Sequence, residues 1–176
     1  MVTVIEPVEG TVKTMIKAIL ACDDYGGVSK DGTLPWPHNS TDLKWFKENT
    51  AEQVVVMGST TWEDPHMPRP LPKRINVLAT SRKDDYPGAD DYINGDLIEQ
   101  VDLLQKKYLD KEIWIIGGPK IIEQTLDIID EFYLSNIPGA YACDTFLPID
   151  SIQEKFTEIW KEDHPAVTFK IYEKRK

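Results

Sequence analysis

The sequence predicts a single α/β domain, from its length, its composition and the alternation of short apolar runs with helical segments. The chain has 176 residues, enough to bury about two-thirds of its unfolded surface in one domain. Hydrophobic residues make up 41% and charged residues 28%, as in ordinary globular proteins. The apolar runs with strand character are Ile16–Cys22, Gln53–Met57, Ile75–Thr80, Glu112–Ile116 and Glu131–Ile137, with two closing strands, Lys155–Trp160 and Ala166–Glu173, within residues 152–174. A structural helix is expected from about Leu97 to Lys107, with Ile98, Val101 and Leu104 on one face.

Charge and cysteine content exclude several classes of function. The formal net charge is -10, and an acidic surface repels polyphosphate, so we expect no nucleic-acid partner. Cys22 and Cys143 lie far apart and the three histidines are scattered, which indicates neither a disulfide framework nor a metal site. No apolar run approaches the length of a membrane span and the first residues lack a signal-peptide pattern. We therefore expect a cytoplasmic protein without a membrane partner.

A helix that begins after Asn39 carries the clearest candidate for catalysis. Asn39 is suited to cap the helix, and Asp42 then takes the third helical position, where a carboxylate interacts favourably with the helix dipole. Asp42 shares one face with Trp45 and Phe46, three and four residues later, so burial would raise its pKa. Considered from the helix alone, Asp42 is better explained as a capping carboxylate that reaches only its own backbone.

Two turns between a strand and a helix have the character of phosphate-binding turns. Gly58 follows one apolar run, and Gly117-Gly118 follows another. A glycine lets the main chain approach a phosphate closely, and the N–H groups of a helix start favour the anion. Each turn is weak as a signal by itself, and the first could be only a polar helix cap.

The order of these motifs resembles that of the dihydrofolate reductase family. The resemblance runs from Met15 to the end of the chain, which predicts a domain over residues 15–176 and leaves residues 1–14 as an N-terminal extension without an assigned role. It implies αβα layers around a mostly parallel, twisted eight-stranded sheet with an antiparallel C-terminal strand. The matching motifs are Leu34-Pro35-Trp36, Asp42-Leu43-x-Trp45-Phe46-Lys47, Gly58-x-x-Thr61-Trp62-Glu63, Arg69-Pro70-Leu71-Pro72-x-Arg74 and Ile115-Ile116-Gly117-Gly118.

The resemblance implies reduction of 7,8-dihydrofolate to 5,6,7,8-tetrahydrofolate by hydride transfer from NADPH. Such an enzyme supports one-carbon metabolism and nucleotide synthesis, and it binds antifolate inhibitors. We expect it to act as a monomer. The implied catalytic residues are Asp42, Trp36 and Ser135, and a loop over residues 24–37 closes over the nicotinamide. The implied substrate-binding residues are Ile19, Ala21, Leu43, Phe46, Lys47, Arg69 and Arg74.

The resemblance also implies the residues that bind NADPH. They are Val28, Gly58, Ser59, Thr60, Thr61, Thr80, Ser81, Arg82, Ile116, Gly117, Gly118, Lys120 and Ile122. The chain departs from the family pattern at Ser59, where arginine is frequent, and at Ile122, where tyrosine is frequent. Because Ser81, Arg82 and Lys120 remain for the adenosine phosphate, we predict NADPH rather than NADH.

Two other functions are compatible with parts of the pattern. A pyrimidine reductase of riboflavin synthesis has a related fold and would keep the Gly-Gly turn, but it need not keep Asp42 and Arg74. A catalytically silent member of the fold, used for binding folate or nucleotide or as a structural component, would explain the departures from the family pattern. Binding of an antifolate without turnover would favour the silent protein.

Overall fold

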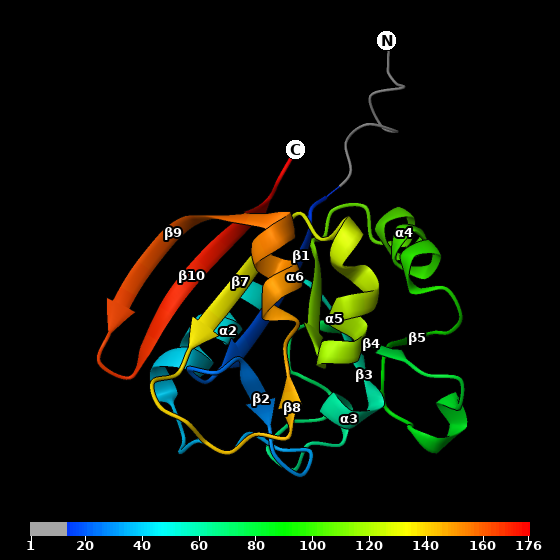
Figure 1. Ribbon diagram of the computed structural model, residues 1–176. Coiled ribbons are helices and arrows are strands. Elements are labelled where there is room, and N and C mark those ends of the chain that lie inside the picture. Colours follow the sequence, from blue (N-terminus) through cyan, green and yellow to red (C-terminus); the bar gives the residue numbers. More distant parts are fainter. Residues whose placement is uncertain (1–13) are drawn as a thin grey trace.

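The computed structural model describes residues 14–176 as an eight-stranded sheet with helices on both faces (Figure 1). The extension that the sequence predicts at residues 1–14 lies, apart from Thr14, outside the described residues. The sheet order is β5-β4-β3-β6-β1-β7-β10-β9. The strands are β1 Ile16–Cys22, β3 Val54–Gly58, β4 Ile75–Ala79, β5 Asp91–Ile93, β6 Ile113–Gly117, β7 Glu131–Asn136, β9 Phe156–His164 and β10 Val167–Lys174.

One strand runs against the others. The pairs β1–β6, β1–β7, β3–β6, β3–β4 and β4–β5 are parallel, whereas β10 is antiparallel to both β7 and β9. This confirms the predicted mostly parallel sheet with an antiparallel C-terminal strand. A separate two-stranded sheet joins β2, Gly27–Ser29, to β8, Thr145–Phe146.

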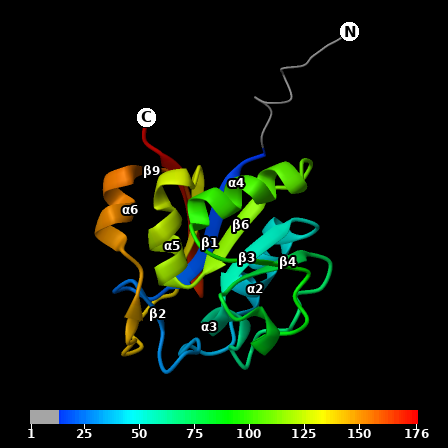
Figure 2. The same ribbon diagram turned by 90° about the vertical axis from the view of Figure 1, so that its right-hand side faces the viewer.

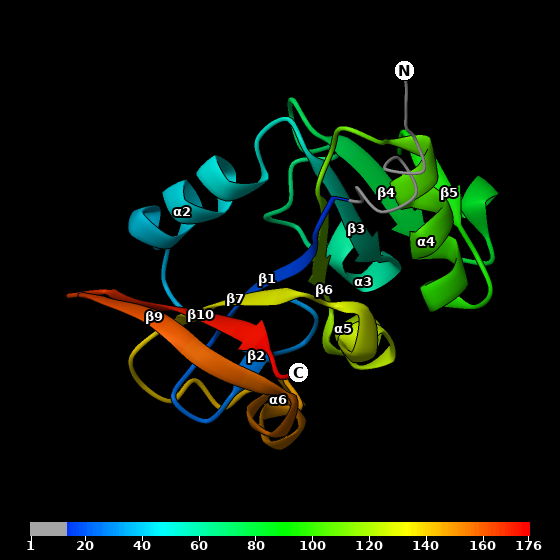
Figure 3. The ribbon, with the colours of Figure 1, turned by 90° about the horizontal axis from the view of Figure 1, so that it is seen from above.

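The helices form two layers, one on each face of the sheet. They are α2 Ser40–Thr50, α3 Ser59–Trp62, α4 Leu97–Lys107, α5 Pro119–Thr125 and α6 Ile149–Lys155, with single turns of 3-10 helix at Lys83–Asp85 and Leu126–Ile128. Figure 2 shows α6, α5 and α4 in a row on one face. Seen from above in Figure 3, α2 lies on the opposite side of the sheet.

Strands buried on both faces explain why the apolar runs in the sequence are continuous. In β3, Val54 and Val56 belong to the core beneath α4, α5 and α6, whereas Val55 and Met57 belong to the core on the α2 side. In α4, Val101 and Leu104 are buried as the periodicity predicts, but Ile98 is 42% exposed. The strands β2, β5 and β8 and the helix α6 were not predicted, because each is short and carries little apolar pattern.

Candidate active site

The segments that the sequence assigns to the site come together at one edge of the sheet, where the parallel strands end. β1 is followed by the loop that contains Trp36, β3 by α3, β4 by Thr80, and β6 by Gly118. Ligands of open α/β sheets bind outside the carboxyl ends of the strands. The topology therefore gathers segments that are distant in the sequence around one edge.

Strands β1 and β6 separate at this edge. Their ladder ends at Ala18 and Ile115, whereas the ladder between β1 and β7 continues to Cys22. The main chain from Ile19 to Ala21 therefore has ladder partners only on the β7 side. Ile19 as a whole residue is only 2% exposed, whereas Leu20 and Ala21, nearer the end of the strand, are half-buried.

Asp42 stands at the start of α2, above the ends of β1 and β7. The helix begins after Asn39 as predicted, and the Asn39 side-chain oxygen accepts a hydrogen bond from the Asp42 N–H over 3.0 Å. The buried Ser135, which is paired with Ala21 across the two strands, donates a hydrogen bond to the Asp42 carboxylate. Burial raises the pKa of Asp42, and the hydrogen bond from Ser135 offsets part of that effect.

Apolar side chains accompany this carboxylate. Trp36 is 8% exposed and packs edge-on against Tyr141, with ring centroids 5.9 Å apart. Leu43 is 48% exposed, and Phe46 is half-buried one turn further along α2. Accessible apolar side chains beside one buried carboxylate suit a planar heteroaromatic ligand with polar ring edges.

Arg74 forms the cationic end of the site. The half-buried guanidinium donates from Nη1 to Thr50 Oγ1 over 3.1 Å and from Nε to a main-chain oxygen over 2.9 Å. Within residues 14–176, no carboxylate lies within ion-pair distance of Arg74. Lys47 and Arg69 are exposed on α2 and on the segment that leads to Arg74. An unpaired, half-buried cation in an acidic chain indicates an anionic ligand.

The turns after β3 and β6 have the geometry that a diphosphate requires. α3 and α5 begin directly after these strands, and their N-caps, Gly58 and Gly118, offer no side-chain acceptor to the first N–H groups. Gly117 has a φ of 124° and is joined to Gly118 by a cis peptide bond, as the resemblance implies. A Cβ on Gly118 would meet nothing within 4 Å, so its main chain is open to approach. The first turn of α3 consists of Ser59, Thr60 and Thr61.

Of the residues assigned to the adenosine phosphate, Ser81 and Arg82 lie just beyond the end of β4, and Lys120 lies in α5. Thr80 Oγ1 accepts a hydrogen bond from the Arg82 N–H over 3.1 Å, which orders this turn. The Arg82 guanidinium is exposed, with Nε 3.5 Å from the Asp85 carboxylate. Exposed pairs of this kind are weak, so Arg82 can exchange this partner for a ligand phosphate. Ser81 and Lys120 are also exposed.

A buried aspartate that the sequence did not identify fastens the loop at its base. Asp23 directly follows β1, and its carboxylate accepts hydrogen bonds from the N–H groups of Tyr25, Gly27 and Tyr141. Burial alone would raise the pKa of Asp23, but these main-chain donors hold it below its usual value. A charged residue at the end of a buried strand was the only signal in the sequence.

The loop contains a short strand and has a second fastening point. β2 lies within the loop and pairs with β8, and Asp144, beside β8, accepts a hydrogen bond from the Asp31 N–H over 2.9 Å. The resemblance implies a supporting role for Asp144, and this contact gives that role a physical basis. The loop is therefore held on the α6 side of the molecule by two carboxylates.

Three residues assigned to the cofactor lie in the core instead. Ile122 is 0% exposed, because it lies on the face of α5 that packs against the sheet. Its side chain has no surface to offer a dinucleotide, which corrects the assignment. Val28 is 5% exposed in the same core. Ile116, at 8% exposure, is near the end of β6 and belongs to the core on the α2 side.

Neither a metal site nor a membrane-spanning helix is found in the part of the chain that the structure describes. Within residues 14–176, no cluster of histidine, cysteine, aspartate and glutamate side chains has a geometry that could hold a metal ion. No helix in this part of the chain is long and apolar enough to cross a membrane.

Comparison with known proteins points to one family. The family model described as dihydrofolate reductase matches residues 15–174. The dihydrofolate reductase of Gallus gallus is 27% identical over 185 residues, covering 93% of this chain and 97% of that protein. That of Haemophilus influenzae is 34% identical over 139 residues, covering 77% and 82%. The solved structure of dihydrofolate reductase from Enterococcus faecalis complexed with NADP(H) and RAB-propyl is similar with a TM-score of 0.78 at 28% identity, covering 92% of this chain and 97% of that chain.

Proposed function

The chain belongs to the dihydrofolate reductase family, and from this premise we propose that it reduces 7,8-dihydrofolate to 5,6,7,8-tetrahydrofolate with NADPH. The observation that carries the proposal is the Asp42 carboxylate, half-buried above the ends of β1 and β7 and hydrogen-bonded by Ser135. A pterin has an amino group and ring nitrogens along one edge, which a buried carboxylate can hold. None of the three histidines occupies a position that matches a family motif, so Asp42 is the acid–base group.

Asp42 has two tasks in this reaction. It holds the amino-pyrimidine edge of the pterin, and it favours the protonated form of the ring nitrogen beside the carbon that accepts hydride. A water ordered near Trp36 completes the path of the proton. Ser135 keeps the carboxylate in place, and the main chain from Ile19 to Ala21, which has no ladder partner on the β6 side, lies against the ring.

The rest of the substrate extends along α2 toward Arg74. Leu43 and Phe46 contact the pterin and the aminobenzoyl ring. Arg74 forms a bidentate pair with a carboxylate of the glutamate tail, and Lys47 and Arg69 add positive charge around it. The unpaired guanidinium of Arg74 in a chain of net charge -10 supports this assignment.

NADPH supplies the hydride when it is bound, and the chain contributes its orientation. Gly58 to Thr61 and Gly117-Gly118 hold the diphosphate with main-chain N–H groups and the Thr61 hydroxyl. Thr80, Ser81, Arg82 and Lys120 hold the adenosine end, and the two cations select the phosphate that distinguishes NADPH from NADH. The loop over residues 24–37 excludes water from the reacting atoms.

We extend the proposal to the organisation of the protein. The functional domain spans residues 15–176, and the chain acts as a monomer in the cytoplasm. The family match over residues 15–174 supports the domain bounds. Antifolates bind the same site as the substrate, because they present a similar amino-pyrimidine edge to Asp42.

The decisive experiment is the loss of reduced-nicotinamide absorbance with dihydrofolate present, for the wild-type chain and Asp42→Asn, from neutral to alkaline pH. We expect Asp42→Asn to lower kcat/KM by about 10²- to 10⁴-fold, and most at high pH, where protons are scarce. Asp110→Asn, at an exposed position, should match the wild type. An inactive wild type that still binds an antifolate would replace the proposed enzyme with a binding protein.

A further inference from the structure

The tip of the active-site loop is a tight hairpin with a fixed geometry. Lys30 and Thr33 exchange two main-chain hydrogen bonds, of 2.9 Å and 3.1 Å. The two residues between them, Asp31 and Gly32, have φ values of 51° and 79°. Positive φ at both central positions is the geometry of a type I′ turn, for which Asp-Gly is a preferred dipeptide. The position of Thr33 is therefore set by local backbone chemistry.

The Thr33 side chain contacts the segment that follows α3. Its hydroxyl lies 3.3 Å from Asp64 Oδ1 and 3.0 Å from His66 Nδ1. Asp64 Oδ1 also accepts the main-chain N–H of His66 over 2.8 Å and lies 3.4 Å from His66 Nδ1, so the carboxylate and the 74% exposed imidazole are neighbours. The Asp64 side chain is only 17% exposed, which strengthens a hydrogen bond to it relative to one in water.

This contact joins two parts of the molecule that are on opposite sides of the candidate cofactor site. Asp23 and Asp144 fasten the loop to the segments beside β7 and β8. Within residues 14–176, the hydrogen bonds between the loop and the segment from α3 to β4 all involve Thr33. Thr33 is also three residues before Trp36, so a displacement of the hairpin would be transmitted directly to the catalytic end of the loop.

We propose that Thr33, Asp64 and His66 form a latch that holds the active-site loop against the diphosphate-binding half and retains the bound cofactor. The inference rests on the proposed function for the identity of the cofactor. These three are positioning residues, because they act through the loop and the α3 segment rather than on the reacting atoms. Release of the cofactor requires the loop to part from the α3 segment, and the latch opposes that motion.

The test compares Thr33→Val, which removes the hydroxyl and keeps the shape, with Thr33→Ser, which keeps the hydroxyl. Two readouts are needed: hydrogen exchange of residues 24–37 in the ligand-free protein, and the dissociation rate constant of NADPH by stopped-flow fluorescence. We expect Thr33→Val to accelerate both by about tenfold, as for a lost hydrogen bond to a charged group. Thr33→Ser should restore both, and dihydrofolate affinity should be unchanged in either variant.

Two further variants make the outcome specific. Thr168→Val removes a threonine hydroxyl that is bonded to Asp163 on the distant β9–β10 hairpin, and it should leave both readouts at wild-type values. Asp64→Ala should reproduce Thr33→Val, and the double variant should add little, because both changes remove the same contact. If Thr33→Val shows the same hydrogen exchange of the loop and the same rate of NADPH dissociation as the wild type, the proposed latch is wrong. Failure of the wild type to bind NADPH would instead overturn the proposed function, since exchange of the ligand-free loop tests the latch separately.

Discussion

Arg74 Nη1 donates a hydrogen bond to Thr50 Oγ1 over 3.1 Å, and this contact fixes the guanidinium against the end of α2. Thr50 is fully buried, and its own hydroxyl donates to the Phe46 carbonyl oxygen over 2.8 Å. The threonine proton is therefore used inside the helix, which leaves the oxygen free to accept from arginine. The same helix that carries Asp42 at its start thus orients the cation at its other end.

This arrangement predicts separate effects on substrate binding and on turnover. Arg74→Lys keeps the charge but loses the planar fork, so we expect KM for dihydrofolate to rise about 10- to 100-fold with kcat nearly unchanged. Thr50→Val should change KM in the same direction and by less. Steady-state kinetics with dihydropteroate, which lacks the glutamate tail, provides the control, because KM for that compound should not respond to Arg74. An unchanged KM for dihydrofolate would remove Arg74 from the site.

Much of the fold and part of the candidate site could be predicted from local sequence. The span Leu97–Lys107 was predicted with the bounds that the helix has. The predicted strands end within one residue of the observed ends, except for β9, which extends to His164, four residues beyond its predicted end. Asn39 caps α2 and Asp42 lies on its apolar side, as spacing alone indicates. These features depend on residues that are close in the chain, where periodicity and capping chemistry act directly.

The rest depends on contacts between distant segments. Thr33 and Asp64 are 31 residues apart, and Asp23 and Tyr141 are 118 apart, so no local pattern marks either pair. Ile122 was assigned to the cofactor from the resemblance, although its helical face is decided by how α5 packs on the sheet. A family pattern assigns a position to the site, but the packing decides whether the side chain or the main chain is presented there.

Gly117 and Gly118 should differ sharply in their tolerance of a side chain. Gly117 has a φ of 124°, and a Cβ there would lie 3.4 Å from both Thr61 Oγ1 and a Leu20 methyl carbon. We expect Gly117→Ala to lower the free energy of unfolding by about 1–3 kcal/mol. Gly118→Ala meets no protein atom, so it should unfold like the wild type but bind NADPH more weakly, since the Cβ occupies the approach to the main chain. Urea unfolding and NADPH titration of both variants check this, and equal stability losses would contradict it.

The ionised form of Asp42 should lower the free energy of unfolding. Because burial raises its pKa in the folded protein, the folded state binds the proton more tightly than the unfolded chain. Stability is therefore lost as pH rises from the unfolded pKa through the folded pKa, and the loss persists above both. Asp42→Asn has no carboxylate to ionise and so avoids this loss of stability. We therefore expect its melting temperature to exceed that of the wild type, by more at pH 8 than at pH 5. The ligand-free proteins should be compared by calorimetry with Asp110→Asn as control; a less stable Asp42→Asn at pH 8 would show that the charge is favourable in the fold.

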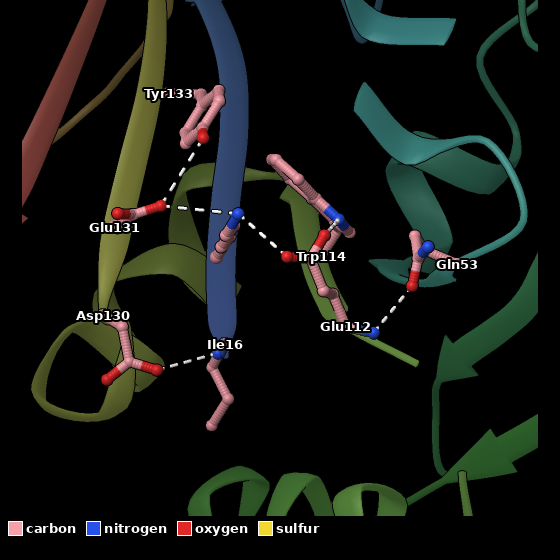
Figure 4. Close-up of polar contacts among 8 residues, drawn as sticks. Ile16, Gln53, Glu112, Trp114, Asp130, Glu131 and Tyr133 are labelled. Atoms are coloured by element: carbon pink, nitrogen blue, oxygen red, sulfur yellow. Dashed lines mark hydrogen bonds and ion pairs between the residues drawn. The ribbon is translucent and has the colours of Figure 1, made fainter. Parts of the chain in front are cut away.

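Lys17 is the centre of an ion-pair network near the start of β1. Figure 4 shows Glu131 on β7 and Glu112 directly before β6, the two strands that flank β1. The Lys17 ammonium lies 2.9 Å from Glu112 and 3.4 Å from Glu131, and 5.2 Å from the centroid of the Trp114 ring. Burial alone would lower the pKa of Lys17, but the hydrogen bond to Glu112 and the nearby negative charges raise it. One cation thus compensates two carboxylates on neighbouring strands.

Removing that cation should destabilise the protein in a pH-dependent way. In Lys17→Met the two glutamates lose their cation and face an apolar side chain, so we expect the free energy of unfolding at pH 7 to fall by about 1–3 kcal/mol. A raised lysine pKa stabilises the fold below the unfolded pKa, near 10.4, and this contribution is lost as pH rises through the folded pKa. The decrease in the free energy of unfolding at alkaline pH should therefore be smaller in Lys17→Met than in the wild type. Lys106→Met, which breaks an exposed pair within α4, should cost less than about 0.5 kcal/mol by urea unfolding. Equal losses for the two variants would mean that the β1 network adds no more than a surface pair.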